Sequence, residues 1–149
     1  MRIDFRYEDG PQDCEALAVD SIREKIYLAS KSLLPACKVY QLPLPTRQPP
    51  EKLVGRWIAT VPISLATGMD ISPNARCAVI CNYGQAFTFG RRRSQPWADA
   101  FAQPPRTIPL PNRQQGESVC FDRHGRNLYL TSEKLPTPLI EVPAESLGT

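Results

Sequence analysis

The chain has 149 residues, 42% of them apolar, which is enough for one domain with a core of its own and hardly enough for two. Its 16 prolines and 8 glycines are too many for a helical bundle and too few for a disordered low-complexity chain. The net charge of +3 is small and its acidic and basic residues are interspersed, so we expect no nucleic-acid partner.

The first predicted elements are a single strand and a hairpin. Residues 2–7 (RIDFRY) alternate charged and apolar side chains, which is the period of a half-buried strand. The stretch CEALAVDSIREKIYLASK (14–31) has two apolar runs around a polar turn, which is typical of a β-hairpin. KVYQLPL (38–44) and LVGRWIA (53–59) follow as a third and a fourth strand.

The rest of the chain repeats this plan twice. A second hairpin is predicted in GMDISPNARCAVICNY (68–83), followed by strands at QAFTFG (85–90) and RTIPLP (106–111). A third hairpin is predicted in ESVCFDRHGRNLYLTSE (117–133), followed by PLIEVP (138–143). Only AESLGT remains after it, so the third set has no convincing fourth strand.

The loop of residues 91–105 interrupts the second set. Trp97, Ala98, Ala100 and Phe101 have the spacing of a short helical turn, which we expect to cover the core rather than to bind a partner. Arg91–Arg93 form the chain's basic cluster, for which a solvated loop is favoured over an anion site.

The three hairpins align without a gap, at offsets of 52 and 50 residues. Asp20 coincides with Ser72 and Asp122 at the turn. The apolar positions that coincide are Val19, Ile71 and Phe121; Ile26, Ala78 and Leu128; Tyr27, Val79 and Tyr129; and Leu28, Ile80 and Leu130. Four strands in roughly every fifty residues are typical of a propeller blade.

The sequence resembles the β-propeller superfamily, especially six-bladed propellers of the NHL, gluconolactonase-like and phytase-like kinds. The resemblance covers residues 13–31, 66–83 and 115–133, whose blades in those families often open on Gly-Glu-Ala or Glu-Ala-Leu-Ala and turn at Ser-Pro-Asp-Gly. Here Asn74-Ala75 stands in place of Asp-Gly, and there is no WD dipeptide.

The resemblance implies an all-β fold of three four-stranded antiparallel blades, at about residues 13–60, 64–111 and 115–143. Three blades cannot close a ring, because propellers close with about four to eight. An open arc would leave an apolar sheet face at each end. We therefore expect a homodimer that closes a six-bladed ring with twofold symmetry, in which residues 2–7 complete the third blade of the partner. The alternatives are that the chain is half of a longer propeller or closes on another partner.

Ligands of propellers enter at a mouth formed by loops, so the residues at the start of each inner strand are candidate binding residues. Glu15, Thr67 and Glu117 occupy this position, and the loop after the second strand returns to the same end. The candidate binding residues are Glu15, Glu117, Thr67, Gln115, Asp13, Lys31, Asn82, Tyr83 and Glu133.

Three functions are compatible with such a mouth. The favoured one is a non-enzymatic scaffold that binds a small molecule or a partner at a polar, carboxylate-lined channel mouth. The first alternative is a metal-dependent hydrolase or lactonase, because carboxylates, amides and hydroxyls suit calcium, which takes about six to eight oxygen ligands. Glu15 and Glu117 are its possible metal ligands, and the resemblance places them where those families hold a metal. The second alternative is an inactive partial propeller.

A structural role for the same glutamates is favoured over metal binding, with Lys31 or Lys134 as the neutralising cation. Nucleophilic catalysis lacks a base, because the one histidine, His124, lies in a turn at the opposite end, where it and Asp122 are expected to cap the turn.

Five cysteines without a CxxC pair exclude a zinc framework, and Cys77 and Cys81 read as small buried residues of a strand. There is no signal-peptide pattern and no apolar run of membrane-spanning length. We expect a protein of the reducing cytoplasm that has no membrane partner.

Overall fold

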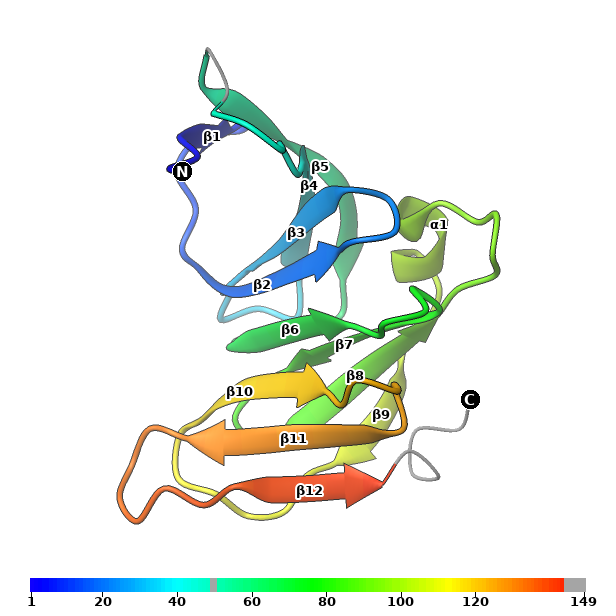
Figure 1. Ribbon diagram of the computed structural model, residues 1–149. Coiled ribbons are helices and arrows are strands. Elements are labelled where there is room, and N and C mark those ends of the chain that lie inside the picture. The colour runs from blue at the N-terminus through cyan, green and yellow to red at the C-terminus, as the bar shows by residue number, and fades with distance from the viewer. Residues whose placement is uncertain (49–50, 144–149) are drawn as a thin grey trace.

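A computed structural model describes residues 1–48 and 51–143 of the chain. Within them the fold is almost entirely β, with three sheets in chain order (Figure 1). The first sheet contains β1 (Phe5–Tyr7), β2 (Cys14–Asp20), β3 (Lys25–Ser30), β4 (Cys37–Pro43) and β5 (Leu53–Val61). The second contains β6 (Gly68–Ile71), β7 (Cys77–Cys81), β8 (Gln85–Gly90) and β9 (Arg106–Pro109), with helix α1 (Trp97–Phe101) before β9. The third contains β10 (Gly116–Phe121), β11 (Asn127–Ser132) and β12 (Ile140–Pro143).

The three predicted hairpins are confirmed, and their registers are equivalent. Val19 pairs with Ile26, Ile71 with Ala78, and Phe121 with Leu128, which are the positions that coincide in the sequence alignment. From each hairpin the sheet continues outward through antiparallel neighbours, β3 to β4 to β5, β7 to β8 to β9, and β11 to β12. The repeat in sequence is therefore a repeat of one supersecondary unit.

The turn of each hairpin is capped by the residue that aligns at its start. The Asp20 carboxylate accepts a hydrogen bond from the Arg23 backbone N–H at 2.9 Å, and the Ser72 hydroxyl accepts one from Cys77 at 3.0 Å. The Asp122 carboxylate accepts two, from the backbone N–H groups of His124 and Arg126. This confirms that Asp122 caps its turn; the His124 side chain instead accepts a hydrogen bond from Arg123.

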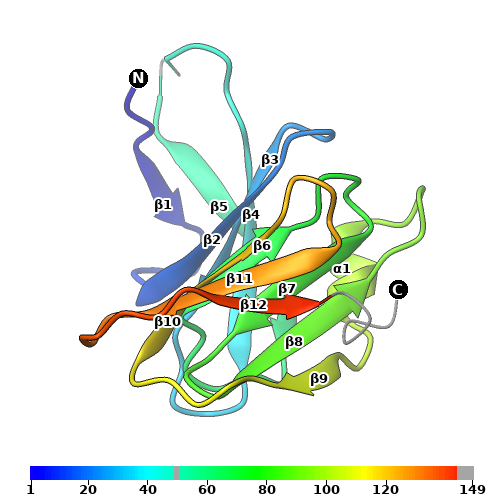
Figure 2. The ribbon, with the colours of Figure 1, turned by 60° about the horizontal axis from the view of Figure 1, so that its bottom comes forward.

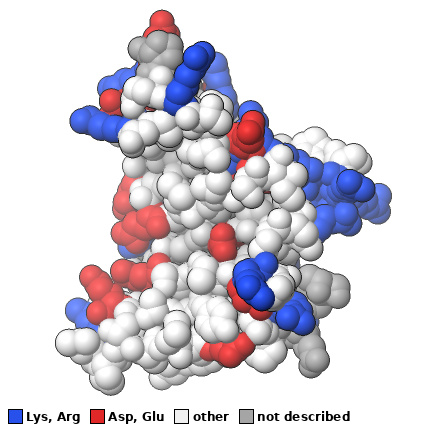
Figure 3. Space-filling model, viewed as in Figure 1, with Lys and Arg blue, Asp and Glu red and all other residues white. Residues whose placement is uncertain are grey.

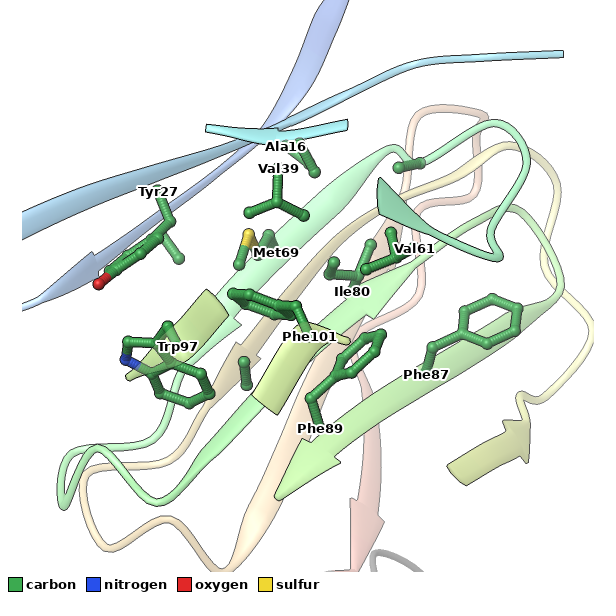
Figure 4. Packing of buried hydrophobic residues seen from close by; sticks show 14 of the residues in the cluster. Ala16, Tyr27, Val39, Val61, Met69, Ile80, Phe87, Phe89, Trp97 and Phe101 are labelled. Atoms are coloured by element: carbon green, nitrogen blue, oxygen red, sulfur yellow. The ribbon is translucent and has the colours of Figure 1, made fainter. Parts of the chain in front are cut away.

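The sheets lie side by side as an arc. β2 packs beside β6 and β6 beside β10, so the first strands of the three hairpins are neighbours along the inner side (Figures 1 and 2). One apolar cluster joins the first two sheets and includes Tyr27, Val39, Met69 and Ile80 (Figure 4). A second joins the last two sheets and includes Cys81, Ile108, Leu128 and Leu130. Each interface between sheets thus has a core of its own.

Helix α1 closes the outer end of the first interface. Trp97, Ala100 and Phe101 are buried, and the rings of Trp97 and Phe101 stack 5.3 Å apart (Figure 4). This confirms their predicted role as core cover. The preceding loop differs from the expectation of a solvated basic cluster, because Arg91 is buried, donates to the Ala75 carbonyl and lies 4.9 Å above the Trp97 ring. Arg92 and Arg93 are exposed.

The N-terminal strand, which was expected on the partner's third blade, lies on the first sheet of its own chain. β1 pairs in parallel with β5 of the same chain, with Phe5 opposite Leu53 and Tyr7 opposite Gly55 (Figure 1). The physical reason is a tertiary contact within the chain, since the Tyr7 ring packs on Tyr40 and anchors the strand to its own first sheet. The first sheet consequently has five strands, where four were expected.

The third sheet has three strands within the residues that the structure describes, matching the lack of a fourth strand in the sequence. All five cysteines are free, and Cys77 and Cys81 are buried as predicted. No described helix is long and apolar enough to cross a membrane.

Candidate binding site at the mouth of the arc

The predicted site residues lie on one side of the arc, the side at which the first strand of each hairpin begins. β2, β6 and β10 begin there and β3, β7 and β11 end there, so positions distant in sequence meet. Figure 3 shows acidic side chains on the side where β2 and β10 begin, and basic side chains near α1 and at the top of the view, by β1 and β5. The mouth is therefore polar, with an excess of carboxylates.

Glu15 and Glu117 occupy equivalent β-bulges. In the first hairpin the register shifts between Cys14 and Ala16, and in the third between Gly116 and Ser118. The skipped residue is the glutamate in both cases. A bulge leaves one residue out of the ladder and redirects its side chain, a device found next to binding sites. The second hairpin shows no such shift, and Thr67 lies just before its first strand.

A hydrogen-bonded triad links the first two sheets at the mouth. The Lys31 ammonium donates to the Glu15 carboxylate at 2.7 Å and to the Tyr83 hydroxyl at 3.0 Å. Lys31 and Tyr83 are aligned positions of successive repeats, so the triad spans two blades. The carboxylate, with the tyrosine hydroxyl as a second acceptor, raises the pKa of Lys31 above its ordinary value. The Glu15 side chain is 41% exposed, so the triad is preorganised and still open to solvent.

Two further predicted residues hold the mouth in place. Thr67 is buried, and its hydroxyl donates to the Gly116 carbonyl at 2.9 Å, which ties the second sheet to the third. The Asn82 amide oxygen accepts from the backbone N–H groups of Gly84 and Gln85, and its nitrogen donates to the Ser64 carbonyl. Both side chains thus hold the loops of the mouth, and ligand binding by them stays a prediction.

The remaining predicted residues contribute mainly backbone hydrogen bonds. The Asp13 carbonyl accepts from the Lys31 N–H at 2.8 Å, and the Gln115 carbonyl accepts from the Glu133 N–H at 3.0 Å. These are equivalent bonds in the first and third blades. Gln115 adopts a left-handed backbone conformation with φ of 47°, and its side-chain oxygen is buried without a hydrogen-bond partner among the described residues.

The predicted ring of carboxylates does not form a metal cluster in the described part of the chain, where no three His, Cys, Asp or Glu side chains gather closely enough to hold an ion. The Glu15 carboxylate is instead paired with Lys31, one of the two cations predicted to neutralise it. Calcium binding by Glu15 and Glu117 stays a prediction, and Lys31 would compete with the ion for Glu15.

Sequence reasoning missed Arg113, which is 8% exposed and lies on the connection between β9 and β10, near the mouth. No sequence signal marks it, because an arginine in a proline-rich connection is ordinarily solvated.

No protein-family model matches the sequence, and the search of curated proteins found no similar chain. Solved structures do match the fold. A chain of the nidogen/laminin complex matches with a TM-score of 0.59 and 18% identity, over 90% of this chain and 44% of the other. A gluconolactonase from Xanthomonas campestris matches with a TM-score of 0.56 and 14% identity, over 94% and 40%. The hydrazine synthase of Kuenenia stuttgartiensis matches with a TM-score of 0.56 and 15% identity, over 89% and 34%.

The chain spans less than half the length of each of these proteins. Identities this low establish the fold and nothing about activity. Three hairpin-based sheets arranged as an arc, together with these matches, make the fold of this chain a partial β-propeller.

Proposed function

We propose that this chain is a binding scaffold whose ligand or partner docks at the polar mouth of a β-propeller. The observation that carries the proposal is the triad of Lys31, Glu15 and Tyr83, which joins two blades by direct hydrogen bonds and remains partly exposed. A charged group that the fold already holds in place can recognise a polar ligand at a low cost in side-chain ordering.

Binding without catalysis is favoured because the described side chains near the triad include no suitable general base. Lys31 donates to the Glu15 carboxylate, which raises the pKa of Lys31 and makes it a poor base. His124, the one histidine of the chain, lies in the turn between β10 and β11, on the side of the arc opposite the mouth. A hydrolase needs a general base whose pKa lies near the working pH, whereas a binding scaffold needs none.

The scaffold is proposed to close into a six-bladed ring with a second copy of the chain. Leu17 and Val19 project from the free face of the first sheet and are 56% and 38% exposed, an apolar strip that a neighbouring blade would cover. The free face of the third sheet offers Tyr129 and Thr131 as its counterpart. Because β1 belongs to its own first sheet, closure would come from packing of these faces and not from exchange of the N-terminal strand.

Light scattering during gel filtration tests closure. The proposal expects a mass of twice 16.7 kDa, and Leu17→Arg should convert the species to a monomer. Ile22→Arg is the matched control, since Ile22 is similarly exposed but lies in a hairpin turn, away from the sheet face. A wild-type monomer at micromolar concentration would rule out the homodimer.

Titration of isotope-labelled protein with gluconate, glucose and an acidic peptide tests the mouth. We expect saturable shifts of the backbone amide signals of Glu15, Lys31 and Tyr83 with at least one probe. Lys31→Met should abolish them, and Lys25→Met should not, because Lys25 lies at the other end of β3. Shifts that persist in Lys31→Met would place binding elsewhere.

The metal-dependent lactonase alternative makes opposite predictions. A scaffold should show no rise in melting temperature with calcium and no acceleration of gluconolactone hydrolysis. A calcium-dependent rise that Glu15→Gln and Glu117→Gln both abolish, with faster lactone hydrolysis, would favour the enzyme and overturn the scaffold.

A further inference from the structure

The loop between β8 and α1 brings arginines together on the side of the arc opposite the mouth. Arg91, Arg92 and Arg93 are consecutive, and the Arg23 guanidinium donates to the Arg93 carbonyl at 2.6 Å. The Arg91 backbone N–H donates to the Arg76 carbonyl at 2.8 Å, so a fifth arginine lies beside the loop. Figure 3 shows basic side chains gathered near α1. The five arginines repel one another, and an anion bound beside them would relieve that repulsion.

Arg91 fixes the path of this loop, and its own guanidinium is turned away from solvent. The guanidinium is buried and donates to the Ala75 and Gln95 carbonyls. Burial lowers the pKa of Arg91, and the charge of Arg23 lowers it further. The Arg92 backbone N–H donates to the Gln95 side-chain oxygen at 3.0 Å, which closes the loop on itself. The backbone that carries Arg92 is therefore held in place before any ligand binds.

A cleft of about 770 Å³ opens beside this loop. Its lining residues are Gly90, Arg91, Arg92, Ser94, Gln95 and Gln103, which include no carboxylate and no apolar side chain. Arg92, Ser94 and Gln103 are exposed, and their side chains make no ion pair or hydrogen bond with another residue that the structure describes. Three groups that can donate hydrogen bonds are thus within reach of a ligand that enters the cleft.

We propose that this cleft binds a small phosphate ester. A phosphate monoester carries close to two negative charges at neutral pH, so it suits several arginines better than a carboxylate does. The exposed Arg92 guanidinium can pair with two phosphate oxygens at once, and Ser94 and Gln103 can donate to the ester.

The lining also limits the rest of the ligand. It offers polar side chains and no apolar wall, which suits a hydrophilic body such as a polyol and not an acyl chain or an aromatic ring. The volume lies within the range of about 300–1,000 Å³ that is usual for small-molecule sites.

The inference stands apart from the proposed function. The lining comes from the end of β8 and the connection to β9 of one chain, so the cleft exists whether or not a ring closes. The mouth, with Glu15 and Lys31, lies on the other side of the arc and is unused.

The experiment titrates isotope-labelled full-length protein with glycerol 3-phosphate, inorganic phosphate, glycerol and sodium chloride, with the ionic strength held equal. Glycerol 3-phosphate should give saturable shifts of the Arg92, Ser94 and Gln103 amide signals. Inorganic phosphate should shift the same signals with weaker affinity, and glycerol and chloride should give no saturable shift. Arg92→Gln should weaken glycerol 3-phosphate binding by about ten-fold or more, the loss expected for charge-assisted hydrogen bonds.

Two matched variants separate a site from the general positive charge of the surface. Arg126→Gln removes the same charge from an exposed arginine outside the lining, and it should bind glycerol 3-phosphate as the wild type does. Arg92→Lys keeps the charge but loses the planar fork, so its affinity should fall between those of the wild type and Arg92→Gln. Because Arg92 is exposed, both of its variants should melt as the wild type does without ligand.

Several outcomes would overturn the proposal. One is the absence of a saturable response to glycerol 3-phosphate, or a response to inorganic phosphate alone. Another is an equal loss of affinity in Arg92→Gln and Arg126→Gln, which would assign binding to the overall charge. A third is binding of an oligothymidylate through Arg92 without a response to glycerol 3-phosphate, which would identify a nucleic-acid surface instead.

Discussion

The first and third sheets, at the two ends of the arc, differ in the composition of their free faces. The free face of the first sheet is apolar, with Ile26, Leu28, Tyr40 and Leu42 forming a buried cluster. The free face of the third sheet carries Ser118, Cys120, Tyr129 and Thr131, all of them at least partly exposed. An apolar face must be covered, whereas a mixed polar face can remain in water.

The N-terminal segment supplies the cover at the first end. The Tyr7 ring lies 4.6 Å from the Tyr40 ring, and Ile3 and Leu53 pack against the same cluster. The Asp9 carboxylate accepts hydrogen bonds from the Tyr40 hydroxyl at 3.0 Å and from the Lys38 ammonium at 2.6 Å. The cover ends before β2, where Leu17 and Val19 stay exposed. The comparison shows that this chain caps the outer part of one end by itself.

The largest loss of stability is expected from a substitution at Tyr40, in the centre of the covered face of the first sheet. Tyr40 is fully buried, so Tyr40→Ala should lower the free energy of unfolding by about 3–5 kcal/mol in urea titrations. Tyr129→Ala, on the other free face, should cost about 1 kcal/mol or less. Equal losses for the two variants would show that both faces are covered.

The contribution of the N-terminal segment is tested at Tyr7. Tyr7→Ala should destabilise the fold by about 1–3 kcal/mol, through lost apolar burial and the lost aromatic pair with Tyr40. Urea unfolding measures it, and Arg2→Ala, in the exposed part of the same segment, is the control. A neutral Tyr7→Ala would mean that β1 does not hold the cover in place.

The stability that Asp9 contributes through Lys38 and Tyr40 should depend on pH. The Lys38 ammonium and the Tyr40 hydroxyl hold the pKa of Asp9 below its ordinary value. A lowered folded pKa gives stability that is present above the unfolded pKa and is lost as pH falls through the folded value. The wild type should therefore melt above Asp9→Asn at neutral pH, and the gap should close in acid below the ordinary pKa of aspartate. A gap that persists there would assign the effect of the substitution to packing.

The smallest effect is expected on the uncovered strip. In dilute protein Leu17→Ser should change the free energy of unfolding by at most about 1 kcal/mol, since the side chain is largely exposed. A larger loss that grows with protein concentration would show that a second copy covers the strip. Thermal melts at two concentrations separate these outcomes.

The sequence by itself determined the repeated unit. Alternating apolar positions specified the strands, and the residues at 20, 72 and 122 specified the turns that they cap, because both signals act over a few residues. The spacing of Trp97 and Phe101 likewise predicted a helical turn that packs on the core. For the mouth, alignment of the repeats brought Glu15, Lys31 and Tyr83 to one end, where the structure joins them.

Only the tertiary structure decided which edge β1 occupies, that Glu15 and Glu117 lie in bulges, and that Arg113 is buried. A strand of three residues can pair with any free edge, and its choice of β5 depends on the distant contact between Tyr7 and Tyr40. The burial of Arg113 depends on Cys81 of β7 and Gly116 of β10, which meet only when the third sheet packs on the second. Local patterns cannot encode such outcomes, because their energies arise between segments that are neighbours in space and not in sequence.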